Sequence, residues 1–394
     1  MTDVLLENYA LADAGRIVTP ALLIYPKIVE QNIRITLGLV GNDPNRWRPH
    51  IKTAKLGAVI RQMMGHGIRN FKCATTLELL TACQVGADDV LVAFAMNGAN
   101  ARRMLELSKQ FPKTRISALI EASQQLAAWR DTGIGIFVDV NPGMNRTGLS
   151  PDRAEEIVKL CVESGAALRG LHWYDGHIST GEPDERRAAA YRGYDRLLEI
   201  VKAVQAAGCP VAEVITSGTP VAPYGYLYPG FQNANFVHRI SPGTVIYNDT
   251  TSLHQLAGFG YQPAAVVLTT VISHPLTEKI TCDAGHKSVS ADAGVPTCAV
   301  IGHPELTPLK PSEEHLPIEG PVGQLPAIGD NLYLVPRHVC PSVNNFDEAL
   351  MIVDGQVTGV ERVSARGHEN PLLGNSDVRF WESPAQSGTV GIRS

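Results

Sequence analysis

The feature that most constrains the fold of this chain is a repeated alternation of short β-type runs and longer amphipathic stretches from residue 19 onward. Such alternation is typical of βα units around a parallel sheet. We expect eight β-type runs, at residues 21–25, 46–52, 69–74, 89–94, 116–120, 134–140, 168–174 and 212–217. Helical patterns lie between several of them, at 55–64, 76–85, 100–110, 152–163 and 185–207. The pattern predicts a (β/α)8 barrel over residues 19–255, close to the ~250 residues typical of that fold.

The sequence pattern changes after residue 255. β-branched runs at 265–272, 279–283, 331–335, 348–353 and 356–363 are separated by turns rich in Gly and Pro, with almost no helical period. This pattern favours a second, all-β domain over residues 256–394, joined by the N-terminal segment 1–18. We expect the Pro- and Glu-rich stretch 305–325 to be a long connecting loop.

Composition excludes several classes of function. The 394 residues carry a formal net charge of -5, which provides no basic footprint for nucleic acid or an anionic membrane. No apolar run approaches the ~20 residues of a membrane span, and the first residues do not resemble a signal peptide. Seven scattered cysteines without a C-x-x-C pair indicate reduced thiols. We therefore predict a cytoplasmic protein whose partner is a small molecule.

Reactive side chains follow several of the predicted barrel strands, as expected for a barrel active site. Lys52 ends the second run, where a desolvated amine is suited to covalent attachment of a carbonyl compound. An ordinary rim lysine is the simpler interpretation of this position. Lys55 is the competing candidate, but the helical pattern places it on a solvated helix.

Two turns after the last predicted strands could hold a phosphate group. Ser217, Gly218 and Thr219 offer hydroxyls and an unhindered backbone N–H group at the place where barrels commonly bind phosphate. Gly243 and Thr244 can add a second wall, although both segments are also ordinary turn sequences.

His338 and Cys340 form a possible metal pair. In a β-type context residues i and i+2 point to the same face, so an imidazole and a thiolate could converge on one Zn²⁺ ion. Without other information, a buried cysteine beside a hydrogen-bonded histidine explains the same residues.

Taken together, these motifs resemble the D-threonine aldolase and D-serine dehydratase family, whose members are pyridoxal-phosphate (PLP) enzymes related to alanine racemase. The resemblance covers nearly the whole chain in the right order. It rests on R-P-H-x-K-T-x-K at 48–55, D-V to G-M-x-R-T-G at 139–148, G-H at 176–177, S-G-T-P at 217–220, P-G-T at 242–244, D-A-G-x-K at 283–287 and P-x-H-x-C-P at 336–341.

The resemblance implies an alanine racemase-like PLP-binding barrel with a second all-β domain, a homodimer, and a divalent metal, Zn or Mn, at His338 and Cys340. It implies that Lys52 carries PLP. The residues expected to contact the cofactor are Lys52, Arg146, Tyr174, Ser217, Gly218, Thr219, Gly243, Thr244 and Tyr247.

The family also implies a lyase acting on β-hydroxy-D-amino acids. We predict retro-aldol cleavage to glycine and an aldehyde, although the cysteine of H-x-C favours D-serine dehydratase, which releases a 2-oxo acid and ammonia. His177 is the candidate general base, because an ordinary imidazole pKa of about 6.5 suits proton transfer near neutral pH. A PLP-binding protein without catalysis remains an alternative. A barrel metal hydrolase would need several His, Asp or Glu ligands at the strand ends, and the sequence offers no such set.

Overall fold

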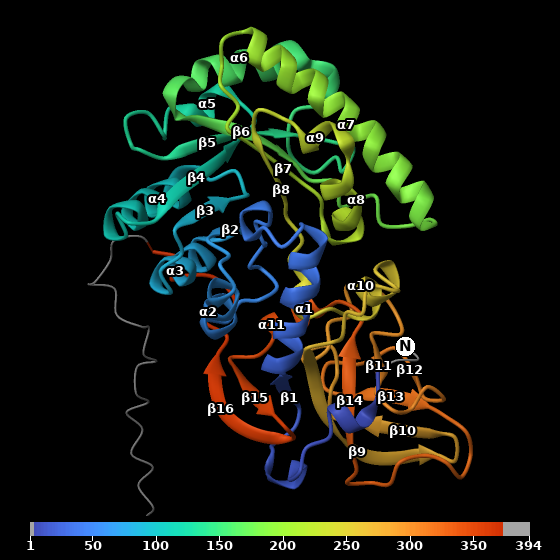
Figure 1. The fold of residues 1–394 in the computed structure, drawn as a ribbon. Coiled ribbons are helices and arrows are strands. Elements are labelled where there is room, and N and C mark those ends of the chain that lie inside the picture. Colours follow the sequence, from blue (N-terminus) through green and yellow to red (C-terminus); the bar gives the residue numbers. More distant parts are fainter. Residues whose placement is uncertain (1–3, 373–394) are drawn as a thin grey trace, which may run out of the picture.

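The structure, a computed structural model, describes residues 4–372 and has two parts (Figure 1). One part contains a parallel sheet surrounded by helices, and the other contains a mixed sheet with few helices. Helix α1 (Pro26–Leu39) runs from the second part into the first.

The parallel sheet has seven strands in sequential order, all pairing in parallel. They are β2 (Asn70–Cys73), β3 (Asp89–Val92), β4 (Arg115–Ile120), β5 (Gly135–Val140), β6 (Leu168–Trp173), β7 (Glu213–Thr216) and β8 (Val237–Ile240). The short segment 47–50 connects the two edges, since Trp47 bridges Ile240 and His50 bridges Lys72. The sheet thereby becomes a barrel, and the predicted alanine racemase-like fold is confirmed.

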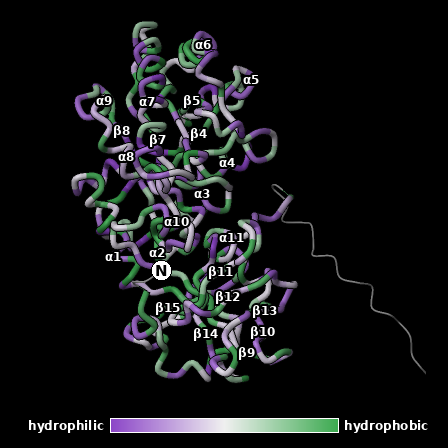
Figure 2. The backbone as a smooth tube through the Cα atoms, turned by 90° about the vertical axis from the view of Figure 1, so that its right-hand side faces the viewer, coloured by the Kyte–Doolittle hydropathy of each residue, from purple (hydrophilic) through white to green (hydrophobic). Residues whose placement is uncertain are grey.

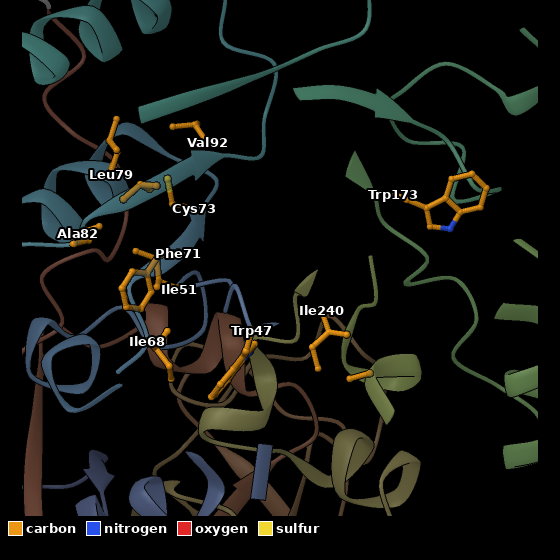
Figure 3. Packing of buried hydrophobic residues seen from close by; sticks show 14 of the residues in the cluster. Trp47, Ile51, Ile68, Phe71, Cys73, Leu79, Ala82, Val92, Trp173 and Ile240 are labelled. Atoms are coloured by element: carbon orange, nitrogen blue, oxygen red, sulfur yellow. The ribbon is translucent and has the colours of Figure 1, made fainter. Parts of the chain in front are cut away.

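Helices surround the barrel and bury one face each against it. They are α1, α2 (Gly57–Gly65), α3 (Thr76–Gln84), α4 (Gly98–Gln110), α5 (Ser123–Leu126), α6 (Ala154–Ser164), α7 (Pro183–Ala206), α8 (Ala222–Leu227), α9 (Pro229–Gln232) and α10 (Thr250–Gln255). The Thr75 hydroxyl accepts a hydrogen bond from the Glu78 N–H and so starts α3. Figure 3 shows Ile51, Ile68 and Phe71 together in the cluster that joins the sheet to its helices.

The second part is built on a nine-stranded sheet. Its strands are β1 (Ala21–Ile24), β9 (Ala265–Leu276), β10 (Lys279–Cys282), β11 (Cys298–Val300), β12 (Thr307–Pro308), β13 (Leu316–Glu319), β14 (Asn331–Pro336), β15 (Glu348–Val353) and β16 (Gln356–Arg362). One short helix, α11 (Val339–Asn344), follows β14. The Tyr9 hydroxyl donates to the Pro263 carbonyl, so the N-terminal segment packs beside this sheet.

Three strand assignments differ from the prediction, and the parallel sheet has seven strands where eight were expected. Residues 21–24 form a strand, but it pairs with β9 and β15 of the second sheet instead of entering the barrel. Strand β8 was missed, because its buried sequence Val-His-Arg-Ile has two polar residues. His238 stacks on Phe231 with 4.1 Å between ring centroids, and Arg239 pairs with Glu213. The segment around residues 47–50 supplies only isolated bridges.

The expected loop at 305–325 was also wrong in part. It contains β12 and β13, which pair with each other, and β13 pairs with β10. Their Pro residues hid a strand pattern that the burial of Leu316 and Ile318 reveals. The end of the predicted 256–394 domain, residues 373–394, lies outside the described residues.

The barrel interior is filled in layers. Leu91, Leu119, Phe137 and Ile215 form an apolar middle layer. Toward the amino ends of the strands, Arg48 contacts both Asp89 and Glu213. Toward the carboxyl ends lie polar residues that belong to the candidate site described below.

Figure 2 shows the molecule from the side, with hydrophobic and hydrophilic residues alternating in short steps along the tube, as expected for elements with one buried face. Among the described residues, no helix combines the length and the apolar character that a membrane span requires. Even α7, with 24 residues, contains many charged side chains.

Candidate active site

Lys52 lies in a turn at the carboxyl end of the barrel, directly after the segment that closes the sheet. The Lys52 N–H group donates to His50 Nδ1 at 3.2 Å. Burial lowers the pKa of His50 well below its ordinary value, and the charge of Lys52 lowers it further. His50 is therefore neutral and acts as an acceptor that fixes the Lys52 backbone.

Lys52 lines a cavity of about 280 Å³. The opposite walls come from three loops that are distant in sequence, and they contribute Gly218, Thr219, Gly243, Thr244 and His338. Tyr174 also lines the cavity, so six of the predicted site residues besides Lys52 meet there, and the cavity spans both parts of the molecule.

Gly243 is required for steric reasons, and space is tight at Gly218. A Cβ atom on Gly243 would collide with the His50 carbonyl oxygen, and one on Gly218 would lie 3.1 Å from the Tyr174 ring. Thr219 and Thr244 each begin a 3₁₀ turn, Thr219–Val221 and Thr244–Ile246. First-turn N–H groups have no partner within their own turn, so these backbones can donate to an anion in the cavity.

Asp175 positions the first of these turns and was not singled out from the sequence. Its carboxylate accepts from Gly218 N–H at 3.0 Å and from the Tyr194 hydroxyl at 2.8 Å. Burial raises the pKa of Asp175 to about 6 against these two hydrogen bonds. Its place directly after β6, in W-Y-D-G-H, is the signal that could have identified it.

The remaining predicted cofactor contacts differ in their surroundings. The Arg146 guanidinium lies over the Tyr174 ring at 5.0 Å, and Tyr174 lines the cavity. The Ser217 hydroxyl lies 2.8 Å from Thr216 Oγ1 and 3.0 Å from the Tyr194 hydroxyl. The Tyr247 hydroxyl donates to the Ala54 carbonyl at 2.8 Å and so holds the turn that carries Lys52.

His177 does not line this cavity. It is exposed, and its ring lies over Gly143, where a Cβ atom would be 3.0 Å from Nε2. Partial burial lowers the pKa of His177, so the imidazole is neutral at pH 7. Its role as general base stays a prediction.

Lys55, the competing lysine, is not on a solvated helix as expected. It lies before α2 with a positive φ of 53°, is buried, and pairs with Glu78 at 3.1 Å. Its Nζ also donates to the Ala365 carbonyl. Lys55 therefore ties the barrel to the end of the second domain, which leaves Lys52 as the cavity lysine of the two.

The predicted β-type context of His338 and Cys340 was wrong. Strand β14 ends at Pro336, His338 is the residue that precedes α11, and Cys340 lies in its first turn. The two side chains still interact, because His338 has the extended backbone of an N-cap residue, from which a side chain can reach the first helical turn. His338 Nδ1 lies 2.6 Å from Asp292 Oδ2, and Cys340 Sγ lies 2.9 Å from Thr53 Oγ1.

These contacts change the acidity of the pair. Interaction with Cys340, and then with Asp292, raises the pKa of His338 to about 9. Burial raises the pKa of Cys340, but His338 and the charge of Lys52 outweigh burial and lower it. The described residues contain no cluster of three or more His, Cys, Asp or Glu side chains arranged for a metal.

Lys72 is the main site residue that sequence analysis missed. It lies on β2, is 2% exposed, and its Nζ is 3.4 Å from His172 Nε2 and 5.5 Å from the Tyr174 ring centroid. His172 Nδ1 in turn lies 2.7 Å from Asp139. A lysine between the apolar residues Phe71 and Cys73 of a β-type run is the signal that could have revealed it.

A larger hollow of about 660 Å³ lies over β1, β15 and β16. Its lining includes Asp13 and Arg16 but no lysine, histidine or cysteine. It therefore lacks the chemistry collected around Lys52.

Comparison with known proteins agrees with this fold. The model of the alanine racemase N-terminal domain matches residues 24–250, and that of a putative serine dehydratase domain matches residues 264–352. The chain belongs to the alanine racemase-like family, and the predicted relationship to D-threonine aldolases and D-serine dehydratases is confirmed.

Individual relatives cover almost the whole chain. A D-threonine aldolase from an Arthrobacter species is 26% identical over 90% of this chain and 94% of its own. A 3-hydroxy-D-aspartate aldolase from Paracoccus denitrificans (strain Pd 1222) is 27% identical with the same coverage. The crystal structure of the Filomicrobium marinum D-threonine aldolase superposes with a TM-score of 0.82 at 24% identity, covering 91% of this chain and 97% of that one. The chain is therefore an enzyme of the PLP-dependent lyase class.

Proposed function

We propose that this enzyme cleaves β-hydroxy-D-amino acids by a retro-aldol reaction to glycine and an aldehyde. The observation that carries the proposal is the composition of one cavity, where Lys52, the turns after β7 and β8, and His338 of the second domain meet. The relatives named for D-threonine and 3-hydroxy-D-aspartate aldolases support this class of substrate.

The cavity fits PLP. Lys52 offers the amine for covalent attachment, and the backbones of Thr219 and of the Gly243–Thr244 turn offer donors to a phosphate whose charge is about -2. The Gly218 N–H group already donates to Asp175 and positions this turn. The absence of a Cβ atom at Gly243 lets this turn pack directly against the backbone of His50, beside Lys52. Bound PLP supplies an electron sink for charge that develops at the substrate Cα.

His338 and Cys340 are the proposed metal ligands. Asp292 occupies His338 Nδ1, which leaves Nε2 for a metal in the carboxylate–histidine arrangement common at metal sites. The lowered pKa of Cys340 favours the thiolate that a metal requires, whereas the raised pKa of His338 means that a metal would have to displace a proton from its imidazole. A divalent ion here, Zn or Mn, would polarise the substrate's β-hydroxyl group.

Dehydration is the second candidate reaction. The softer Cys340 ligand and the match to a serine dehydratase domain favour it. The homodimer and the cytoplasmic location remain predictions that accompany either reaction.

Product analysis with D-threonine, D-3-hydroxyaspartate and D-serine tests the proposal. Glycine and an aldehyde support aldol cleavage, whereas a 2-oxo acid and ammonia identify a dehydratase. Bound PLP without turnover of any of the three would indicate a non-catalytic protein.

The cofactor assignment is tested by borohydride reduction followed by peptide mapping. We expect the label on Lys52 and its loss in Lys52→Ala, whereas Lys287→Ala, at an exposed lysine, keeps it. A label on Lys55 or Lys72 contradicts the assignment.

The metal assignment predicts that chelation stops turnover and leaves the absorbance of bound PLP unchanged, with Zn²⁺ or Mn²⁺ restoring turnover. Asp292→Asn should weaken metal binding by about 10–100-fold. Asp354→Asn, at an exposed carboxylate paired with Lys27, is the matched control. Full activity of a His338→Ala, Cys340→Ala variant after chelation would remove the metal from the reaction.

A further inference from the structure

Lys72 is a buried lysine that has no ion-pair partner in the described chain. No carboxylate oxygen of residues 4–372 lies within 4.0 Å of its Nζ, and its polar contact is the neutral ring of His172 at 3.4 Å. A buried ammonium without a carboxylate partner is costly, so the neutral amine is favoured. Burial, followed by the charge of Lys52, lowers the pKa of Lys72 to about 7.

Lys72 lies directly beside the segment that carries Lys52. The Lys72 N–H group donates to the Pro49 carbonyl at 2.9 Å, and the Lys72 carbonyl accepts from Ile51 N–H at 2.8 Å. Phe71 packs in the outer core, so alternation along β2 turns Lys72 toward the barrel interior. Its amine therefore lies inside the barrel, 5.5 Å from the ring centroid of Tyr174. Tyr174 lines the cavity, whereas Lys72 lies behind that wall and does not itself line the cavity.

Neighbouring histidines are less suited to hold a proton. Burial lowers the pKa of both His50 and His172, and nearby lysines lower it further. His50 Nδ1 accepts from Lys52 N–H, and the two ring nitrogens of His172 contact Asp139 and Lys72. Lys72 is the remaining basic group, and its pKa of about 7 lets it gain or lose a proton near neutral pH.

We propose that Lys72 Nζ accepts the proton that a substrate ammonium must lose before its nitrogen can replace Lys52 on PLP, and returns it when the product amine leaves. This inference rests on Lys52 being the residue that holds PLP. The substrate ammonium becomes an amine while Lys72 becomes an ammonium, and the reverse transfer at product release restores both groups. No other reactant is needed.

Several groups face Lys72 and set its charge from the elements packed around it. Lys52 and Arg48 disfavour the ammonium form, whereas Asp139 and Asp175 favour it. His172 contacts it directly, and Arg146 lies on the far side of the shared Tyr174 ring.

Rapid mixing of PLP-loaded protein with D-alanine tests the transfer, because D-alanine has no β-hydroxyl group and cannot be cleaved. The absorbance change of bound PLP reports the exchange of amines. At pH 7 we expect Lys72→Met to slow this change by about 100-fold, the scale of general base catalysis. The rate of Lys72→Met should recover as the pH approaches the pKa of the D-alanine amino group, because D-alanine then enters the site already as the free amine.

Two variants serve as controls. Lys72→Arg keeps a cation that cannot accept a proton, so it should be as slow as Lys72→Met at pH 7. Lys287→Met, at an exposed lysine, should match the unaltered protein. Unchanged exchange rates and an unchanged pH profile in Lys72→Met would overturn the proposal.

Nuclear magnetic resonance of ¹⁵N-lysine-labelled protein provides a measurement that needs no turnover and no stable variant. A lysine Nζ that titrates near pH 7 supports the proposal, and titration of every lysine above about pH 9 overturns it. Peptide mapping separates the two levels of inference. PLP on a residue other than Lys52 contradicts the proposed function, whereas PLP on Lys52 with unchanged exchange in Lys72→Met contradicts only the role of Lys72.

Discussion

The two ends of the barrel interior treat a buried cation in opposite ways. At the amino ends of the strands, Arg48 donates to Glu213 at 2.8 and 3.0 Å, to Asp89 at 3.0 Å and to the Phe71 carbonyl at 3.1 Å. At the carboxyl ends, the Lys72 Nζ atom has one polar contact within residues 4–372, at 3.4 Å with His172 Nε2. Both residues are almost completely buried.

This difference separates a charge that stabilises the fold from one suited to chemistry. A fully hydrogen-bonded guanidinium stays charged and fixes the strands around it. A poorly paired amine is free to change its protonation state near neutral pH, which is the property of a functional group. The carboxyl ends are also the functional face of barrels in general.

Replacement of Arg48 gives the largest expected effect on stability. Arg48→Met removes the cation shared by Asp89 and Glu213, which keep Arg169 and Arg239. It should lower the free energy of unfolding by about 3 kcal/mol, the lower end of the range for breaking a buried ion pair. Arg48→Lys keeps a charge but loses the two-pronged contact with Glu213, so it should cost less. Denaturant unfolding measures both. Equal stability of Arg48→Met and the unaltered protein would break the comparison.

The same comparison predicts a pH dependence. Burial raises the pKa of Asp89, but Arg48 and Arg169 outweigh it and hold the pKa below its usual range. A lowered carboxyl pKa stabilises the fold above the unfolded pKa of about 3.9, and this contribution is lost as the pH falls. The difference in free energy of unfolding between Arg48→Met and the unaltered protein should therefore be largest near neutral pH and should shrink in acid.

Replacement of Lys72 should have the opposite sign. Lys72→Met removes a poorly paired buried amine and should stabilise the PLP-free protein at pH 7 by about 1–4 kcal/mol. Because the pKa of Lys72 is about 7 when folded and about 10.4 when unfolded, stability of the unaltered protein rises with pH between these values. The advantage of Lys72→Met should shrink across that window, as measured by thermal unfolding. If Lys72→Met were instead less stable than the unaltered protein at pH 7, Lys72 would stabilise the fold as Arg48 does.

The smallest expected effect concerns the hydroxyl of Thr219, which lies in a turn proposed to bind the PLP phosphate. Thr219→Val should weaken PLP binding by about 1.5–3 kcal/mol, the range for a hydrogen bond to a charged group. Ser217→Ala sharpens the test, because its hydroxyl already contacts Thr216 and Tyr194, and we expect a smaller loss. Titration of PLP-free protein measures both. Unchanged affinity in Thr219→Val would move the phosphate toward Gly243 and Thr244.

Much of the site could be predicted because its residues lie in short motifs at the ends of strands. Lys52, Gly218, Thr219, Gly243 and Thr244 line one cavity, as expected of loops that follow parallel strands. Asp175 and Lys72 were missed because a polar residue beside an apolar run is ordinarily a solvated one, and only burial shows otherwise.

The sequence by itself determined the two classes of sheet and the order of the barrel strands, because local alternation of apolar residues encodes period and burial. It could not assign residues 21–24 to a sheet, since an apolar strand is equally stable wherever both faces are covered. Only the tertiary structure decided that β1 joins β9 and β15, and that Val237–Ile240 completes the barrel. The tertiary structure also decided that Arg48, and not Lys72, has carboxylate partners among the described residues. These partners, Asp89 and Glu213, lie on strands separated by more than a hundred residues of sequence.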